Sequence, residues 1–186
     1  MDGVKTVTAA MRPGTSILIV GAMGVGKTTT AQVLEQNYGY RRYSLAEPIH
    51  RVVETAFPWL KDEAKSIRRT YLQRTGAFLR SFVPNPILRH AEAALENSTG
   101  PLVIDDGRTV EEAEWARERG MAVVVLTCEN DERRRRLLAR DGALPGPIAF
   151  KDATEQEWTR VQAPRVDTTH LSPAEAALAL LSAIDH

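Results

Sequence analysis

Cysteine and histidine are scarce in this chain of 186 residues, and long hydrophobic runs are absent. The single cysteine, Cys128, cannot form a disulfide within the chain, which is typical of proteins from a reducing cytoplasm. No apolar stretch has the length of a membrane-spanning helix, so we expect no association with a membrane. The four histidines have neither metal-ligand spacing nor the pattern of a catalytic triad. These absences argue against a secreted, membrane-embedded or metal-dependent hydrolytic protein and favour a cytoplasmic one.

An excess of charge of either sign is also absent. Lys and Arg together number 24, and so do Asp and Glu, which gives a formal net charge of zero. A neutral chain has no general attraction for nucleic acid, so we expect no nucleic-acid partner. At this length we expect a single domain over residues 1–186. The sequence leaves open whether that domain forms a homodimer.

What the sequence does contain is the segment GAMGVGKT, Gly21 to Thr28, which fits the phosphate-binding pattern G-x4-G-K-[ST]. A strand-like apolar segment precedes it and a helix-like segment follows it, as the motif requires. Lys27 provides a positive charge for the β- and γ-phosphates of ATP, and the Thr28 hydroxyl is a ligand for Mg²⁺. Backbone N–H groups of the loop would hold the phosphates. The expected ATP-binding residues of this segment are Gly21, Ala22, Met23, Gly24, Val25, Gly26, Lys27, Thr28 and Thr29.

Strand-like and helix-like segments alternate along the chain, which predicts an α/β fold with a parallel sheet. The strand-like segments lie near residues 16–20, 40–44, 101–106, 121–127 and 165–167. Three consecutive helical stretches separate the second strand from the third, so residues 45–99 are interpreted as a helical insert that binds a second substrate. Residues 141–159 lack periodicity and are interpreted as a lid. The remaining core comprises residues 15–44, 100–140 and 160–186.

Two carboxylates, Asp105 and Asp106, end the third predicted strand. In folds with a phosphate-binding loop, the strand beside the loop strand ends in a carboxylate associated with the metal ion. Both residues are therefore candidates, with Thr28, for a Mg²⁺ site, although a solvated strand end is the alternative. Adjacent strand residues point in opposite directions, so the sequence does not decide between the two. Arg108 lies near the same edge and could contact an acceptor phosphate.

A run of arginines occupies a predicted helix near residues 130–141. Leu137 and Leu138 are assigned to its buried face. Three arginines then fall within an arc of about 60° beside that face: Arg133, Arg136 and Arg140. We expect Arg136 and Arg140 to neutralise charge on a transferring phosphoryl group as the lid closes, with a solvated basic face as the alternative.

Within the insert, Arg80 stands among apolar residues and is the arginine best suited to bind an anion. Gln73 is placed either to recognise a base edge or simply to face solvent. Apolar contacts to the core are expected from Ile67, Tyr71 and Phe78.

Three further segments resemble the phage-type deoxynucleoside monophosphate kinases of the P-loop nucleotide kinase superfamily. They are YGYRRYSLAEPIHRVV, RTYLQRTGAFLR and VIDDGRTVEEAEWARERG, and with the loop at Gly21 the resemblance covers nearly the whole chain. It implies the P-loop kinase fold, a five-stranded parallel sheet in the order 2-3-1-4-5 flanked by helices, with an acceptor-binding insert and a lid. A phage-encoded member of this family would act in the host cytoplasm.

The same resemblance implies transfer of the ATP γ-phosphoryl group to a deoxynucleoside monophosphate with Mg²⁺, so the partners are small-molecule nucleotides. The implied catalytic residues are Lys27, Arg108, Arg136 and Arg140. The implied acceptor site consists of Ser44, Gln73, Arg80, Asp105, Arg108 and Glu112. After Arg108 the family carries Phe and Pro-Asn where this chain has Thr109, Val110 and Glu111, so the base preference stays open.

Two late segments, RLLARDG and VDTTHLSPAEAA, are instead similar to dephospho-coenzyme A kinases. That similarity implies that residues 167–170, including Thr169, lie near the ATP base. Those kinases carry Asp-Ala-Asp after the second strand, where this chain has SLAEP, which favours the nucleotide acceptor. A P-loop ATPase or binding module is the third hypothesis, and it leaves the groups around Arg80 and Arg108 unexplained.

Overall fold

The computed structural model describes residues 14–142, 144 and 154–184. In this part of the chain, five parallel strands form one sheet in the order β2-β3-β1-β4-β5, and this confirms the predicted order. The strands are β1 (Ile17–Val20), β2 (Arg41–Tyr43), β3 (Leu102–Gly107), β4 (Ala122–Thr127) and β5 (Arg165–Asp167). All four residues of β1 are fully buried, as expected for the central strand of a parallel sheet covered on both faces.

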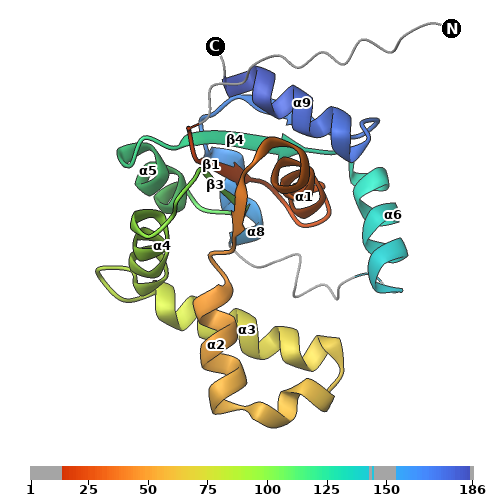
Figure 1. Ribbon diagram of the computed structural model, residues 1–186. Helices are drawn as coiled ribbons and strands as arrows, with labels where there is room; N and C mark the ends of the chain where they lie inside the picture. Colours follow the sequence, from red (N-terminus) through yellow and green to blue (C-terminus); the bar gives the residue numbers. More distant parts are fainter. Residues whose placement is uncertain (1–13, 143, 145–153, 185–186) are drawn as a thin grey trace, which may run out of the picture.

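Alternate residues of β1 belong to two separate apolar cores. Ile17 and Ile19 pack with α1 (Lys27–Tyr38) and α9 (Pro173–Ile184). Leu18 and Val20 pack with α4 (Pro86–Glu96) and α5 (Val110–Glu118) on the opposite face. Figure 1 shows these two layers on either side of the sheet. The two-residue period of a strand thus produces the three-layer architecture.

Local capping signals define several helix starts. Asn85 accepts a hydrogen bond from the Ile87 N–H at the start of α4, with Pro86 as its first residue. Thr109 and Glu112 form the predicted reciprocal capping box at the start of α5, and a second box joins Ser172 to Glu175 before α9. These contacts satisfy backbone N–H groups that have no partner within the helix.

Of the predicted insert, residues 45–99, the helix α4 packs on the sheet core. The name insert is kept below for the remaining part, which comprises α2 (Glu47–Ala56), the 3₁₀ helix η1 (Pro58–Asp62) and α3 (Lys65–Arg80). It projects from the sheet in Figure 1. The prediction that Ile67 and Phe78 contact the core is wrong, because their side chains are 43% and 62% exposed. Helix α3 packs mainly on α2. The face of α3 that is buried carries Gly76, where an added Cβ would lie 3.1 Å from Ile49 Cδ1 of α2. Tyr71 packs on Phe57 inside the insert, with ring centroids 4.9 Å apart.

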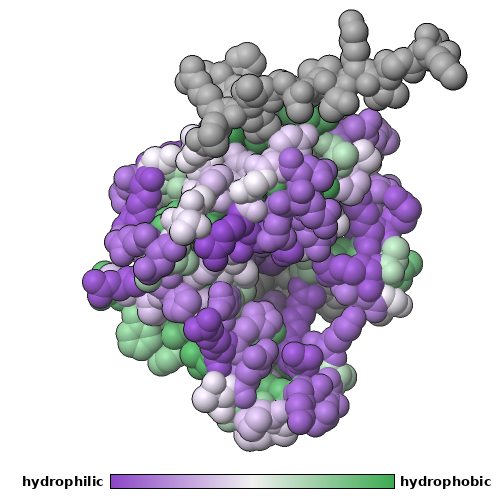
Figure 2. Space-filling view, in the orientation of Figure 1, coloured by the Kyte–Doolittle hydropathy of each residue, from purple (hydrophilic) through white to green (hydrophobic). Residues whose placement is uncertain are grey.

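Where α3 leads into α4, an apolar area lies at the surface, at the lower left of Figure 2. Its exposed residues include Phe78, Phe82 and Val83.

Helix α6 (Asn130–Asp141) stands beside the start of α1. Leu137 is buried as expected, but Leu138 is 51% exposed, so the wider buried face predicted for this helix is wrong. Within the described part of the chain, Leu137 is the buried residue of this helix, and it meets the phosphate-binding loop. Most of the predicted lid, namely residues 143 and 145–153, lies outside the described residues, and α8 (Thr154–Glu157) and η2 (Trp158–Arg160) follow. None of the described helices is long and apolar enough to cross a membrane.

Candidate active site

The phosphate-binding loop joins the end of β1 to the start of α1, at the edge where the parallel strands end. Gly24 has φ +86°, and a Cβ there would lie 2.9 Å from Leu137 Cγ of α6. Only glycine fits both the backbone conformation and the close approach of α6. The loop and the first turn of α1 therefore form a compact cradle, in which N–H groups and the helix dipole favour an anion.

Lys27 is almost fully buried, with 8% exposure. Its Nζ donates hydrogen bonds to the carbonyl oxygens of Gly21 and, at 2.8 Å, Ala22. Burial, reinforced by the positive charge of Arg108, lowers the pKa of Lys27 to about 7, although the nearby carboxylates oppose the shift. A bound polyphosphate would add the negative charge that this ammonium group needs. The Lys27 side chain is thus hydrogen-bonded to its own loop, at a position from which it can rotate toward a bound phosphate.

Asp105 and Asp106 have different partners, and Asp105 is the one beside the loop. It is 5% exposed, and its Oδ2 accepts a hydrogen bond from Arg42 Nη2 at 3.2 Å. The Thr28 side chain hydrogen-bonds to the same carboxylate. Burial and the neighbouring Asp106 raise the pKa of Asp105, while Arg42 and Thr28 act against that rise. The hydroxyl of Thr28 and the carboxylate of Asp105 are hard oxygen ligands on adjacent elements, and they fit Mg²⁺.

Asp106 is engaged with the start of the insert. Its carboxylate accepts hydrogen bonds from Ser44 Oγ at 2.7 Å and from the backbone N–H groups of Leu45 at 2.8 Å and Ala46 at 2.9 Å. Ser44, which the family resemblance assigned to the acceptor site, is therefore bonded to this carboxylate. The two adjacent aspartates thus have separate contacts: Asp105 is bonded to Thr28, and Asp106 to the turn that begins α2.

A cavity of about 910 Å³ runs along this edge of the sheet. That volume is in the range of small-molecule binding sites. The predicted donor residues that line it are Met23, Gly24, Gly26, Lys27, Thr28, Thr29, Arg136 and Thr169. Gly21, Ala22 and Val25 belong to the loop and are buried behind it. The cavity is also lined by Asp105, Asp106, Arg108 and Arg140, so it extends from the nucleotide cradle to the predicted acceptor end.

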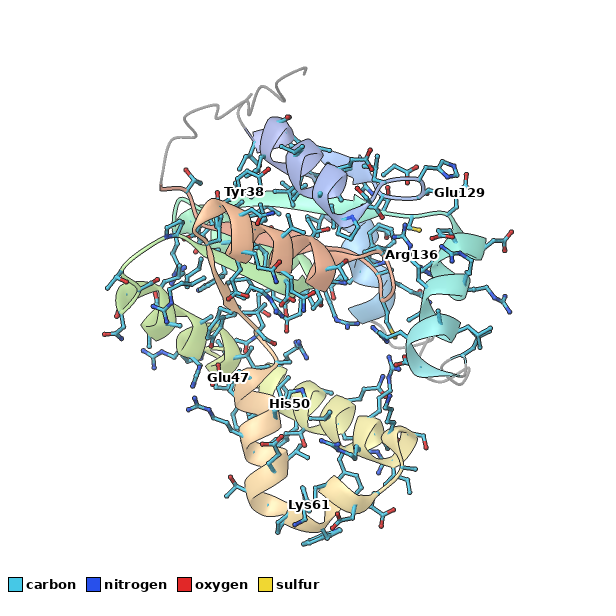
Figure 3. The ribbon with its side chains drawn as sticks, turned by 45° about the vertical axis from the view of Figure 1, so that its right-hand side comes forward. Tyr38, Glu47, His50, Lys61, Glu129 and Arg136 are labelled. Carbon is cyan, nitrogen blue, oxygen red and sulfur yellow. The ribbon has the colours of Figure 1, made fainter. Side chains whose placement is uncertain are left out.

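Arg136 projects from α6 toward the loop between β5 and α9 (Figure 3). Its guanidinium donates to Glu132 Oε1 at 2.7 Å, to the Thr168 carbonyl at 2.6 Å and to the Thr169 carbonyl at 3.3 Å. A Cβ on Gly26 would lie 3.6 Å from its Nη1. Arg136 therefore joins α6, the phosphate-binding loop and the β5–α9 loop at the donor end of the cavity.

Arg140 differs from Arg136 although the two share a face of α6. It is exposed, and its Nη2 donates to Asp141 Oδ2 at 2.7 Å. A surface ion pair of this kind is weak and screened by solvent. Of these two arginines, Arg140 is the one that can turn further into the cavity without breaking several part-buried hydrogen bonds.

At the acceptor end, Arg108 and Arg80 meet at a buried carboxylate. Glu112 is 1% exposed, and its Oε2 accepts from the Arg108 backbone N–H at 2.7 Å. Its Oε1 accepts from Arg80 Nη2 at 3.3 Å. Burial lowers the pKa of Arg108, an effect that Asp106 and Glu112 oppose and Arg80 reinforces. Arg108 lines the cavity, whereas Glu112 and Arg80 stand behind it and hold its position.

Arg69 is a site residue that the sequence reasoning missed. Its Nη2 donates to Met23 Sδ of the phosphate-binding loop at 2.8 Å, and its charge also acts on Arg108. A signal was present in the sequence, because Arg69, Gln73 and Arg80 recur at helical spacing and share one face of α3. Gln73 is half-buried on this face. Arg42, the partner of Asp105, had no comparable signal.

Solved structures show that the fold is that of the P-loop kinases. TT1252 from Thermus thermophilus has a TM-score of 0.61 at 21% identity, covering 93% of this chain and 98% of that one. A gluconokinase from Sinorhizobium meliloti 1021 has a TM-score of 0.60 at 17% identity, covering 94% of each chain. A shikimate kinase from Acinetobacter baumannii, in complex with shikimate, has a TM-score of 0.56 at 19% identity, covering 92% of this chain and 93% of that one.

The family follows from the sequence match. Residues 17–154 match the family described as the AAA domain, and the chain belongs to that family. The match includes the phosphate-binding loop, both strand-end aspartates and the arginine helix. No curated protein sequence matches the chain significantly.

Proposed function

We propose that this protein transfers the γ-phosphoryl group of ATP to a deoxynucleoside monophosphate, giving a deoxynucleoside diphosphate. The donor phosphates would lie on the N–H groups of the loop and on Lys27. Thr28 and Asp105 would hold Mg²⁺, which neutralises charge on the β- and γ-oxygens. Arg108 would hold the acceptor phosphate, and Arg140 would turn inward to neutralise the transferring group. Positioning and electrostatics then provide the acceleration.

The observation that carries the choice of acceptor is the engagement of both strand-end carboxylates. An alcohol acceptor needs a general base to remove its proton, whereas a phosphate acceptor is already ionised. Asp106 already accepts three hydrogen bonds, and Asp105 is paired with Arg42. Neither carboxylate is poised as a base. The cationic groups of Arg69, Arg80 and Arg108 at the same end of the cavity instead suit a phosphate-bearing acceptor.

The test is a coupled assay of ADP release in which candidate acceptors are titrated one at a time. The set comprises each deoxynucleoside and ribonucleoside monophosphate, dephospho-coenzyme A, gluconate and shikimate. We expect ADP release to rise well above the background hydrolysis only with deoxynucleoside monophosphates. Preferential turnover of dephospho-coenzyme A, or ADP release that no acceptor stimulates, would replace the proposal with a coenzyme-type kinase or an ATPase module.

An Arg108→Met variant serves as the internal control for the acceptor. If Arg108 holds the acceptor phosphate, the variant raises the KM for the monophosphate and lowers turnover by about 10²-fold or more, while the affinity for ATP is kept. A variant that loses ATP affinity instead would place Arg108 on the donor.

A further inference from the structure

Thr168 follows directly on β5 and is buried, with 2% exposure. Its backbone N–H donates to the Thr127 carbonyl at 2.9 Å, continuing the contact between β4 and β5. The similarity to dephospho-coenzyme A kinases places residues 167–170 near the ATP base, but it gives Thr168 no contact with the phosphate-binding loop. Its side chain nevertheless lines the donor end of the cavity, between α6 and the phosphate-binding loop.

The Thr168 hydroxyl connects these two elements. Its Oγ1 lies 2.8 Å from the Val25 carbonyl oxygen of the phosphate-binding loop and 3.0 Å from the Thr127 carbonyl oxygen. It accepts from Arg136 Nη1 at 3.2 Å. A hydroxyl has only one hydrogen to donate. The Thr127 oxygen already accepts the backbone N–H of Thr168, so the shorter contact, to Val25, is the one that the hydroxyl satisfies.

The resulting relay runs from Arg136 through Thr168 to Val25, and it controls the orientation of one peptide group. In a planar trans peptide, the C=O of one residue and the N–H of the next point in opposite directions. Holding the Val25 carbonyl toward Thr168 therefore turns the Gly26 N–H away from it. Gly26 lines the cavity, and Val25 is 1% exposed behind the loop. The N–H is thus aimed where a phosphate oxygen would lie.

We propose that Thr168 is a positioning residue for the phosphate-binding loop, acting through the Val25 carbonyl and the Arg136 guanidinium. The flanking glycines leave this peptide group conformationally free, so a fixed external partner is needed to preorganise it. The same residue belongs to the loop that lines the cavity at Thr169 and His170. Thr168 therefore links two parts of the cavity wall, the loop between β5 and α9 and the phosphate-binding loop.

The inference rests on ATP as the donor in the proposed function, but not on the identity of the acceptor. It is tested by calorimetric titration of the full chain with two probes, ATP and inorganic triphosphate, and no acceptor. Thr168→Val removes the hydroxyl at nearly constant shape, and Thr168→Ser keeps it. We expect Thr168→Val to weaken both probes by a similar factor of about ten, and Thr168→Ser to bind both within about twofold of the parent protein.

Thr127→Val provides the matched control, because the Thr127 hydroxyl contacts only the Val166 carbonyl, at 3.5 Å, among the described residues. We expect this variant to bind both probes normally. Thermal unfolding of all three variants shows whether the binding loss merely follows lost stability. Unchanged triphosphate binding in Thr168→Val would overturn the proposal, as would an equal loss in Thr127→Val.

A second measurement covers the case in which Thr168→Val folds poorly. If Thr168 and Arg136 form one relay, the affinity losses of Thr168→Ala, which removes the hydroxyl without adding a buried methyl group, and of Arg136→Lys are non-additive when combined. Strict additivity would show that the two residues act separately. Because both measurements omit the acceptor, failure to phosphorylate deoxynucleotides would leave this inference standing.

Discussion

At the donor end of the cavity, the phosphate-binding loop is backed by buried apolar side chains, whereas at the acceptor end the insert combines apolar packing with polar ties to the sheet. Ala22 and Val25 belong to the same buried cluster as Leu126 of β4. The insert reaches the sheet core through Leu45 and Ile49. It is also held by Asp106 at its start and by the Arg80–Glu112 pair near its end, and large apolar residues are exposed where α3 leads into α4 (Figure 2).

Apolar packing and polar tethers respond differently to a ligand. A packed core has essentially one arrangement, while ion pairs at a partly exposed surface can exchange one partner for another. We therefore infer that the donor cradle is preformed and that the acceptor end completes itself when a second anion arrives. Glu112 holds Arg80 through its guanidinium and Arg108 through its backbone N–H, and an acceptor phosphate would become a further partner of the two guanidinium groups. Each prediction below tests one side of this contrast.

The largest effect is expected at the donor end, from Lys27→Met. Loss of a preorganised positive charge beside the transferring phosphoryl group costs about 10³-fold in turnover. Because Lys27 is buried and its pKa is lowered, the substitution removes a desolvated charge and should not reduce the melting temperature. Steady-state turnover and thermal unfolding are measured on the same preparation. Low turnover accompanied by a clear drop in melting temperature would attribute the loss to folding instead.

A second prediction separates two arginines on one helix. Arg140→Ala should lower turnover by about 10²-fold or more at nearly unchanged ATP affinity, because its only described partner is Asp141 on the surface. Arg136→Ala should mainly weaken ATP binding, because its guanidinium holds the Thr168 and Thr169 carbonyls. Turnover and ATP affinity are measured for both variants. If both variants lose turnover alone, Arg136 acts on the transferring phosphoryl group after all.

This difference illustrates what the sequence could predict. The helical wheel placed Arg136 and Arg140 on one arc, since that depends only on spacing. Arg140 pairs with the adjacent Asp141, whereas the carbonyl groups that Arg136 meets lie in the loop after β5, about thirty residues further along the chain, and no local pattern encodes that contact. The strand order, the loop and the caps at Asn85, Thr109 and Ser172 were predictable because their determinants lie within a few residues of each other.

The acceptor end shows the same limit more strongly. Alternation along β3 established that Asp105 and Asp106 point in opposite directions, but the partner of each comes from another element, Thr28 for the first and Ala46 for the second. Ile67 and Phe78 were expected inside because they are apolar. They are exposed because the insert is only two helices thick and buries a single stripe of α3.

A third prediction uses the pH dependence of stability to measure the free-energy cost of burying the Lys27 charge in the donor cradle. The pKa of Lys27 is about 7 in the folded protein and 10.5 ordinarily, so between these values the unfolded chain binds more protons, and stability rises with pH. The full cost of burying the charge is present below pH 7. From pH 7 to pH 9 this residue should add about 2 kcal/mol to the free energy of unfolding.

Denaturant unfolding at pH 7 and pH 9, in the absence of nucleotide, measures this change. Lys27→Met is the control, because it keeps every other titrating group and lacks this one. The parent protein should gain more stability than the variant over this range. Equal pH dependence in the two proteins would mean that Lys27 stays protonated in the folded state.

The smallest effect is expected on the surface where α3 leads into α4, where Phe78→Ser should change the free energy of unfolding by less than about 0.5 kcal/mol. Phe78 is 62% exposed and contacts the ring of Phe82 at the surface, with centroids 5.0 Å apart. Ile49→Ala is the matched comparison within the same insert, since Ile49 is 5% exposed and faces Gly76. It should cost about 2–5 kcal/mol. Denaturant unfolding of both variants decides the point: a loss at Phe78 as large as that at Ile49 would mean that this surface is covered in solution.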